Sequence, residues 1–131
     1  MKLWIDDIRK APEGWHTART VTEAIALLDE NNVSEVSLDH DISHGITLGI
    51  GRNSPITRPY PCGETFVPVI RFIISKINGL RFGETCYLDK ITLHSSNNKG
   101  RETMRWLLVG LKKDIRIIES PMKACNRLEI C

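Results

Sequence analysis

The sequence predicts one three-layer α/β domain built on a five-stranded parallel sheet. Two observations support this fold class: short apolar strand patterns alternate with amphipathic helix patterns, and polar or charged residues follow the strand patterns directly. The length of 131 residues is typical of a single domain with one hydrophobic core. Because the sequence contains no internal repeat and no interdomain linker, we expect residues 1–131 to form one domain.

The first part of the chain predicts three strands and one helix. Pro12 and Gly14 mark a tight connection after the first strand and leave little room for a helix there. Thr20 and Glu23 form a capping box, which starts a helix. The expected elements are strands at residues 2–6, 16–19 and 33–38 and a helix from residue 20 to the Asn31-Asn32 pair.

The second part predicts two helices and two strands. Pro68 lies in the first turn of one helix, where its missing N–H group costs little, and Gly110 closes the other helix. The expected elements are helices at residues 64–78 and 98–110 and strands at residues 87–93 and 115–118. Residues 43–63 are rich in glycine and proline and predict a long loop, either a lid or a plain surface insertion. The tail at residues 122–131 has no clear period.

Composition and charge argue against several classes of function. The chain has 18 Lys and Arg residues and 16 Asp and Glu residues, and the net charge of +2 gives no electrostatic basis for bulk binding of nucleic acid. No apolar stretch approaches the roughly 20 residues that span a bilayer, and the first residues do not resemble a signal peptide. We therefore expect a cytoplasmic protein without membrane association. The four cysteines form no C-x-x-C pair, so we expect free thiols rather than a zinc site.

Acidic residues follow the first and third predicted strands. Asp6 and Asp7 come after the first, and Asp39 comes after the third. Ligands of parallel sheets bind beyond the carboxyl ends of the strands, so we expect these carboxylates to meet at one edge. Oxygen ligands of this kind suit Mg²⁺ or Mn²⁺, and the sequence therefore predicts a metal site. The alternative is that Asp6 and Asp7 cap a turn and form salt bridges with Arg9 and Lys10.

Two histidines lie at strand ends that we expect to be close in the sheet. His40 follows Asp39, and His94 follows the strand at residues 87–93. An imidazole with a pKa near ~6.5 can transfer protons at neutral pH, so we predict catalytic roles for His40, His94 and Asp39. The alternative for either histidine is a structural residue with satisfied hydrogen bonds. The sequence leaves open whether Asp39 or Asp41 faces the site.

Residues 94–101 run from a strand end into a helix start. Free backbone amides and the positive end of the helix dipole favour an anion at such a position, and an arginine can bind phosphate through two parallel hydrogen bonds. The alternative is an ordinary helix cap by Asn97 or Asn98 with a solvated basic pair. The predicted phosphate-binding residues are Ser95, Ser96, Asn97, Lys99, Gly100 and Arg101.

The acidic pair in LWIDD, the aspartate that ends VSLD and the hydroxyl residue in TLHSS resemble the receiver domain of two-component response regulators. The resemblance implies that Asp6 and Asp7 hold Mg²⁺. It also implies that Asp39 is the phosphoacceptor and that Ser95 supplies the switch hydroxyl. Two departures are clear. A receiver has a lysine before the proline after its last strand, where this chain has Ser120-Pro121, and a receiver has a helix between its first two strands.

The sequence shares these departures, and the motifs SLDHD and HSSNNKGRETM, with cyclic-phosphate processing receiver domains, and it resembles that family. The resemblance extends over residues 1–121 and implies a receiver-like, flavodoxin-like fold with strand order 2-1-3-4-5 and a first receiver helix that is reduced or absent. It also implies a site that binds or processes cyclic phosphates of nucleotides or RNA ends.

The sequence supports three hypotheses about function. The first is a metal-dependent phosphoesterase that opens a cyclic phosphate, with carboxylates holding Mg²⁺ or Mn²⁺ and histidines exchanging protons. The second is a binding module that senses or sequesters a cyclic nucleotide without chemistry. The third is a phosphoacceptor receiver, which the missing lysine disfavours. The expected partner is a cyclic nucleotide or a ligand that ends in a cyclic phosphate, and the oligomeric state stays open.

Overall fold

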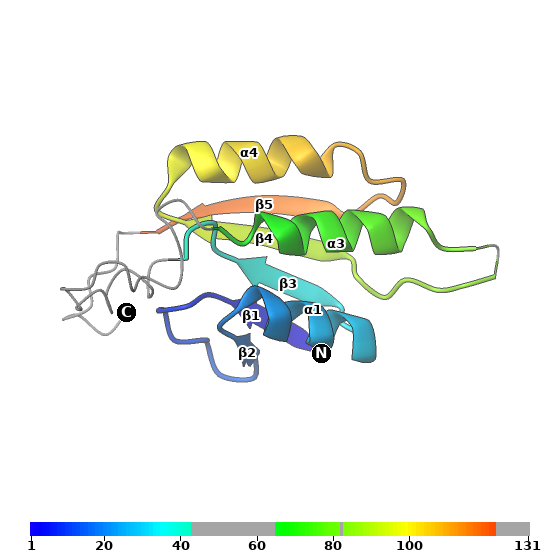
Figure 1. The fold of residues 1–131 in the computed structure, drawn as a ribbon, viewed down its shortest axis with the longest axis horizontal. Helices are drawn as coiled ribbons and strands as arrows, with labels where there is room; N and C mark the ends of the chain where they lie inside the picture. Colours follow the sequence, from blue (N-terminus) through cyan, green and yellow to red (C-terminus); the bar gives the residue numbers. More distant parts are fainter. Residues whose placement is uncertain (43–64, 82, 123–131) are drawn as a thin grey trace.

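The computed structural model describes residues 1–42, 65–81 and 83–122. Five parallel strands form one sheet in the order β2-β1-β3-β4-β5 (Figure 1), which confirms the predicted sheet and its strand order. The strands are β1 (Lys2–Ile5), β2 (His16–Ala18), β3 (Glu35–Leu38), β4 (Lys90–Ser95) and β5 (Arg116–Pro121). The helices are α1 (Val21–Glu30), α3 (Val67–Asn78) and α4 (Asn98–Leu108). None of the helices in the described ranges combines the length and the apolar character that crossing a membrane requires.

The predicted elements are present, with shifts at their ends. The Thr20 hydroxyl accepts the N–H of Glu23 and caps α1, and α3 carries a proline in its first turn, as predicted. β5 extends three residues beyond the predicted strand because its pairing with β4 continues to Pro121. Cys86 is a free thiol. The predicted loop at residues 43–63, the other three cysteines and most of the tail at residues 122–131 lie outside the described residues.

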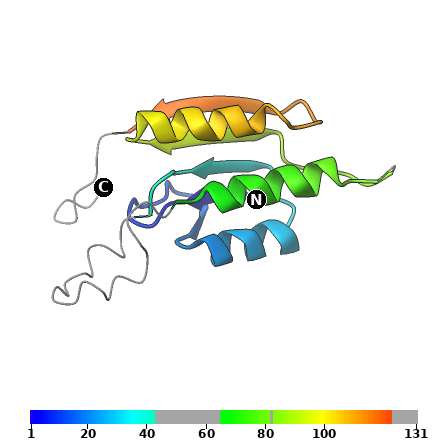
Figure 2. The same cartoon turned by 45° about the horizontal axis from the view of Figure 1, so that its top comes forward.

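All three helices lie on one face of the sheet (Figures 1 and 2). Each helix lies in a connection between two strands, and all three of these connections lead from one strand to another that is nearer to β5. Connections of this kind are right-handed, so connections that run in the same direction place their helices on the same face of the sheet. The connection from β1 to β2 steps the opposite way and therefore crosses the second face. Residues 6–15, all of which are described, form turns there instead of a helix, as the sequence predicted. The expected third layer is therefore not seen in the described part of the chain.

The two faces of the sheet have different chemistry because side chains alternate along each strand. The helix-covered face is the hydrophobic core, to which the central strands contribute Leu3, Ile5, Val36, Leu38, Ile91 and Leu93. Trp4, Ser37 and His94 occupy the intervening positions and face the other way, and all three are buried. Trp15, from the connection before β2, lies edge-on against Trp4 with ring centroids 6.0 Å apart. The second face thus supports a polar site at the carboxyl ends of the strands.

Candidate functional site

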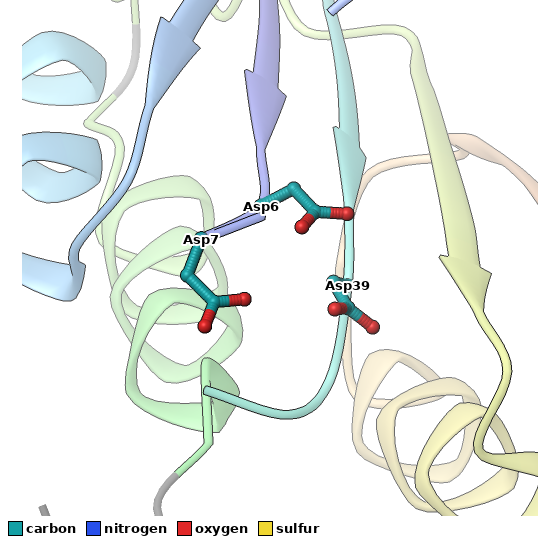
Figure 3. Close-up of side chains that lie close together, drawn as sticks. All are labelled: Asp6, Asp7 and Asp39. Carbon is teal, nitrogen blue, oxygen red and sulfur yellow. The ribbon is translucent and has the colours of Figure 1, made fainter. Parts of the chain in front are cut away.

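The three predicted metal ligands lie together at the edge of the sheet (Figure 3). Asp6 and Asp7 follow β1, and Asp39 follows the adjacent strand β3. One carboxylate oxygen from each residue lies within 4.8 Å of the others. Asp6 and Asp39 are buried, and Asp7 is half-buried. Three oxygen donors at this spacing could hold a metal ion.

The Asp6 carboxylate accepts hydrogen bonds at both of its oxygens from other described residues. Its Oδ1 accepts the backbone N–H groups of Ile8 and Arg9, both at 2.9 Å. Its Oδ2 accepts Nε2 of His94 at 2.8 Å and the Arg9 guanidinium at 3.2 Å. Burial would raise the pKa of Asp6, but the hydrogen bonds from His94 and the two backbone groups outweigh burial and lower the pKa of Asp6 below its ordinary value. Asp6 is therefore ionised at neutral pH.

Asp39 has the opposite electrostatic character. Burial and the negative charge of Asp6 raise the pKa of Asp39 to about 7, although a hydrogen bond from Ser95 and the charge of Arg9 work against this rise. The two neighbouring carboxyl groups therefore differ strongly in their affinity for a proton. A pKa near neutrality means that Asp39 can gain or lose a proton when a cation or a ligand enters the site.

Arg9 neutralises part of this acidic cluster. A single guanidinium nitrogen lies 3.2 Å from Asp6 and 3.3 Å from Asp39, so the side chain bridges the ends of β1 and β3. The sequence raised a salt bridge to Arg9 only as the alternative to a metal site. The structure contains both the carboxylate cluster and the bridge. The spacing of three residues between Asp6 and Arg9 could have predicted this salt bridge, because the turn after β1 brings the Arg9 side chain back to the edge where Asp6 lies.

His94 is buried beneath the acidic cluster. Its Nδ1 is 2.7 Å from the Ser37 hydroxyl and its Nε2 is 2.8 Å from Asp6, while its ring stacks on Trp4 with centroids 3.9 Å apart. Burial lowers the pKa of His94 by more than the hydrogen bond and charge of Asp6 raise it. A neutral ring that donates from Nε2 to Asp6 and accepts at Nδ1 from Ser37 satisfies all these contacts. This arrangement favours the structural alternative for His94.

A second polar cluster joins the end of β3 to the start of α4. Nδ1 of His40 lies 2.7 Å from Asp41, and the Asn97 amide donates to both oxygens of the same carboxylate at 3.1 and 3.2 Å. The backbone N–H of His40 also donates to Asp39 at 2.7 Å, which ties this cluster to the acidic one. The question left open by the sequence is therefore answered: Asp39 belongs to the acidic cluster, and Asp41 faces His40.

The close packing of His40 against α4 depends on Gly100. A Cβ atom at Gly100 would lie 2.4 Å from Cγ and 2.6 Å from Nδ1 of His40, which is far inside contact distance. We expect Gly100→Ala to push the imidazole away from Asp41 and to lower the free energy of unfolding by roughly 1–3 kcal/mol, measured by urea denaturation. Gly110→Ala is the matched control, because its nearest neighbour would be 3.7 Å away. Equal stability of the two variants would contradict the packing role of Gly100.

The predicted phosphate-binding residues separate into two groups. Arg101 is buried and bound within the protein: its guanidinium donates to Glu119, to the carbonyl of Ser95 and to the Asn98 side chain. Asn97 caps α4 by accepting the N–H of Gly100 at 2.8 Å, so the predicted cap is present. Ser96 and Lys99 are exposed at the same helix start. The exposed pair is better placed than the Arg101 side chain to meet a ligand.

The strand order and the carboxylates after β1 and β3 define a receiver-like protein of the flavodoxin-like class. A family model described as the cyclic-phosphate processing receiver domain matches residues 1–109. The chain belongs to this family. No curated protein and no solved structure gave a significant match.

Proposed function

We propose that the protein binds a cyclic phosphate of a nucleotide or of an RNA end at the carboxyl edge of the sheet and hydrolyses it. The observation that carries this proposal is the direct connection of two clusters: the acidic residues after β1 and β3 meet the His40–Asp41 pair through the Asp39–His40 turn. One cluster can hold a cation, and the other can hold a proton. Opening a cyclic phosphate requires both functions.

Asp6, Asp7 and Asp39 would hold the divalent ion. Bound Mg²⁺ or Mn²⁺ would supply Lewis-acid stabilisation of the charge that develops on the phosphoryl oxygens. The family description names cyclic-phosphate processing, and a metal ion held here would give that description a chemical basis. Asp6 is suited to ligation because its lowered pKa keeps it ionised, whereas Asp39, with its pKa of about 7, would have to release its proton to solvent before it could hold the ion.

His40 is the proposed general base. When Nδ1–H donates to Asp41, Nε2 of His40 is the basic nitrogen of the ring and can remove a proton from water. The water oxygen then forms a new P–O bond, one ring P–O bond breaks, and the released oxygen takes up a proton from solvent. The product is an open phosphomonoester. His94 acts as a positioning residue that holds Asp6.

The start of α4 is the proposed phosphate subsite. Ser96, Lys99 and the backbone amides of Asn98 and Lys99 at the helix start would contact the phosphate oxygens, and the helix dipole favours the negative charge. Arg101 supports this subsite by fixing the carbonyl of Ser95 and the side chain of Asn98. Asn97 connects the subsite to the His40–Asp41 pair.

The test is incubation with nucleoside 2′,3′-cyclic phosphates, 3′,5′-cyclic nucleotides and a short RNA with a 2′,3′-cyclic end, each with Mg²⁺, Mn²⁺ or EDTA. We expect a phosphomonoester product in ³¹P NMR spectra, formed only with metal. His40→Gln should lower kcat about 10²–10⁴-fold. Asp114→Asn is the control, because Asp114 is exposed and precedes β5 at the opposite edge of the sheet.

The possible outcomes separate the proposed enzyme from a binding module. Tight binding with unchanged ligand recovered afterwards would favour the non-catalytic module that senses or sequesters a cyclic nucleotide. The absence of both binding and turnover across the panel would overturn the proposal. A stable acyl phosphate on Asp39 after treatment with acetyl phosphate would instead indicate a phosphoacceptor receiver.

A further inference from the structure

Arg9 occupies the position from which a cation would bridge Asp6 and Asp39. We propose that Arg9 and a divalent ion compete for these two carboxylates, so that Arg9 sets the metal affinity of the site. This inference rests on the metal site of the proposed function. It adds that the metal-free state carries a built-in cation and that the ion must displace it.

Arg9 already contacts oxygen atoms that a metal ion at this site would need. The Arg9 guanidinium contacts Oδ2 of Asp6 and Oδ2 of Asp39, so it uses one oxygen of each carboxylate. On Asp6 the same oxygen also accepts from His94, and the second oxygen accepts two backbone N–H groups. An ion that binds Asp6 must therefore take a position at an oxygen that is already in use. Among the groups that bond to the Asp6 carboxylate, Arg9 carries a full positive charge, and a metal ion would repel it.

The Arg9 side chain can leave the two carboxylates while the Arg9 backbone stays in place. The Arg9 carbonyl accepts Nε1 of Trp4 at 3.2 Å and the guanidinium of Arg19 at 2.7 Å. The Arg9 N–H donates to Asp6. The backbone is thus fixed on both sides of Cα, and the turn that shapes the acidic cluster does not depend on the guanidinium. A rotamer change of one side chain is sufficient for exchange.

The positive charge of Arg9 opposes the charge of a metal ion at these carboxylates. The Arg9 side chain is only 9% exposed, so its charge lies inside the site and not in bulk water. A divalent ion and a guanidinium at the same two oxygens would repel each other in an environment of low dielectric constant. Joint occupancy is therefore unfavourable, and each cation lowers the affinity of the site for the other.

The direct test is Mn²⁺ binding followed by electron paramagnetic resonance in the absence of any nucleotide. Arg9→Gln removes the competing charge, and we expect it to bind Mn²⁺ roughly tenfold or more tightly than the wild type. Lys10→Gln is the matched control, because it removes one positive charge from the adjacent, exposed position. Mn²⁺ affinity that is equal or weaker in Arg9→Gln than in the wild type, or that rises equally in both variants, would overturn the proposal.

A second measurement uses the wild type and does not depend on the folding of a variant. The Nε–H signal of Arg9 in a ¹⁵N correlation spectrum reports on its buried bridge, and Mg²⁺ should shift or abolish this signal in step with changes at Asp6 and Asp39. An Arg9 signal that stays constant while the amides of those two residues titrate would contradict displacement. Neither measurement uses a cyclic phosphate, so failure of competition is distinguishable from failure of the proposed enzymatic function.

Discussion

Replacing His94 by alanine is expected to lower the free energy of unfolding by about 3–5 kcal/mol. The ring is only 1% exposed, stacks on Trp4 and bonds to both Ser37 and Asp6. Truncation would leave a cavity, remove one hydrogen bond from a buried carboxylate and leave a buried hydroxyl without its partner. Urea denaturation at pH 7.5 in EDTA measures this loss without any contribution from bound metal.

Two further variants identify the source of that stability. His94→Phe keeps an aromatic ring over Trp4 but loses both hydrogen bonds, so its expected loss is roughly 1–3 kcal/mol. His16→Ala changes an exposed histidine on β2 and should stay within about 0.5 kcal/mol of the wild type. If His94→Ala were as stable as His16→Ala, the structural role assigned to the buried ring would be wrong, and a purely catalytic role would regain support.

The sheet was predictable because its signals are local in the sequence. Core residues such as Ile5, Leu38 and Leu93 are the last apolar residues of short strand patterns, and a polar residue follows each of them directly. Parallel strands of this kind bring their carboxyl ends to one edge whatever the details of packing. The grouping of Asp6, Asp7 and Asp39 follows from that rule alone. The tight connection at Pro12 likewise predicted that no helix would lie between β1 and β2.

The contacts that tune the site were less predictable, because they depend on the register between strands. Ser37 and His94 are far apart in sequence and meet only because β3 pairs with β4 and both side chains face away from the helices. The sequence suggested a catalytic histidine, whereas this pairing buries the ring. Arg101 shows the same limit: its position in a basic helix start suggested phosphate binding, but Glu119 on the adjacent strand β5 bonds to the side chain.

Asp39→Asn is expected to make the protein more stable at pH 8 while changing its stability little near pH 4. The pKa of Asp39 is about 7 in the folded protein against an ordinary value of 3.8. As the pH rises, the unfolded chain therefore loses this proton first. The stability that protonated Asp39 contributes is full below about pH 4 and is lost as the pH rises through about 7. The gap between 3.8 and about 7 corresponds to roughly 4 kcal/mol.

The comparison with the variant is needed because His94 has the opposite pH dependence. The pKa of His94 is lowered by burial, so the unfolded chain takes up the proton first, and stability is lost as the pH falls below about 6.5. In the wild type, the pH dependences that Asp39 and His94 give to the free energy of unfolding overlap. The difference in free energy of unfolding between the wild type and Asp39→Asn isolates the contribution of Asp39. Urea denaturation in EDTA should show a difference that grows from near zero at pH 4 to roughly 2–4 kcal/mol at pH 8, after allowing for the lost bridge to Arg9. A difference that is constant with pH would show that folding does not raise the pKa of Asp39, and the contrast drawn between its proton affinity and that of Asp6 would lose its basis.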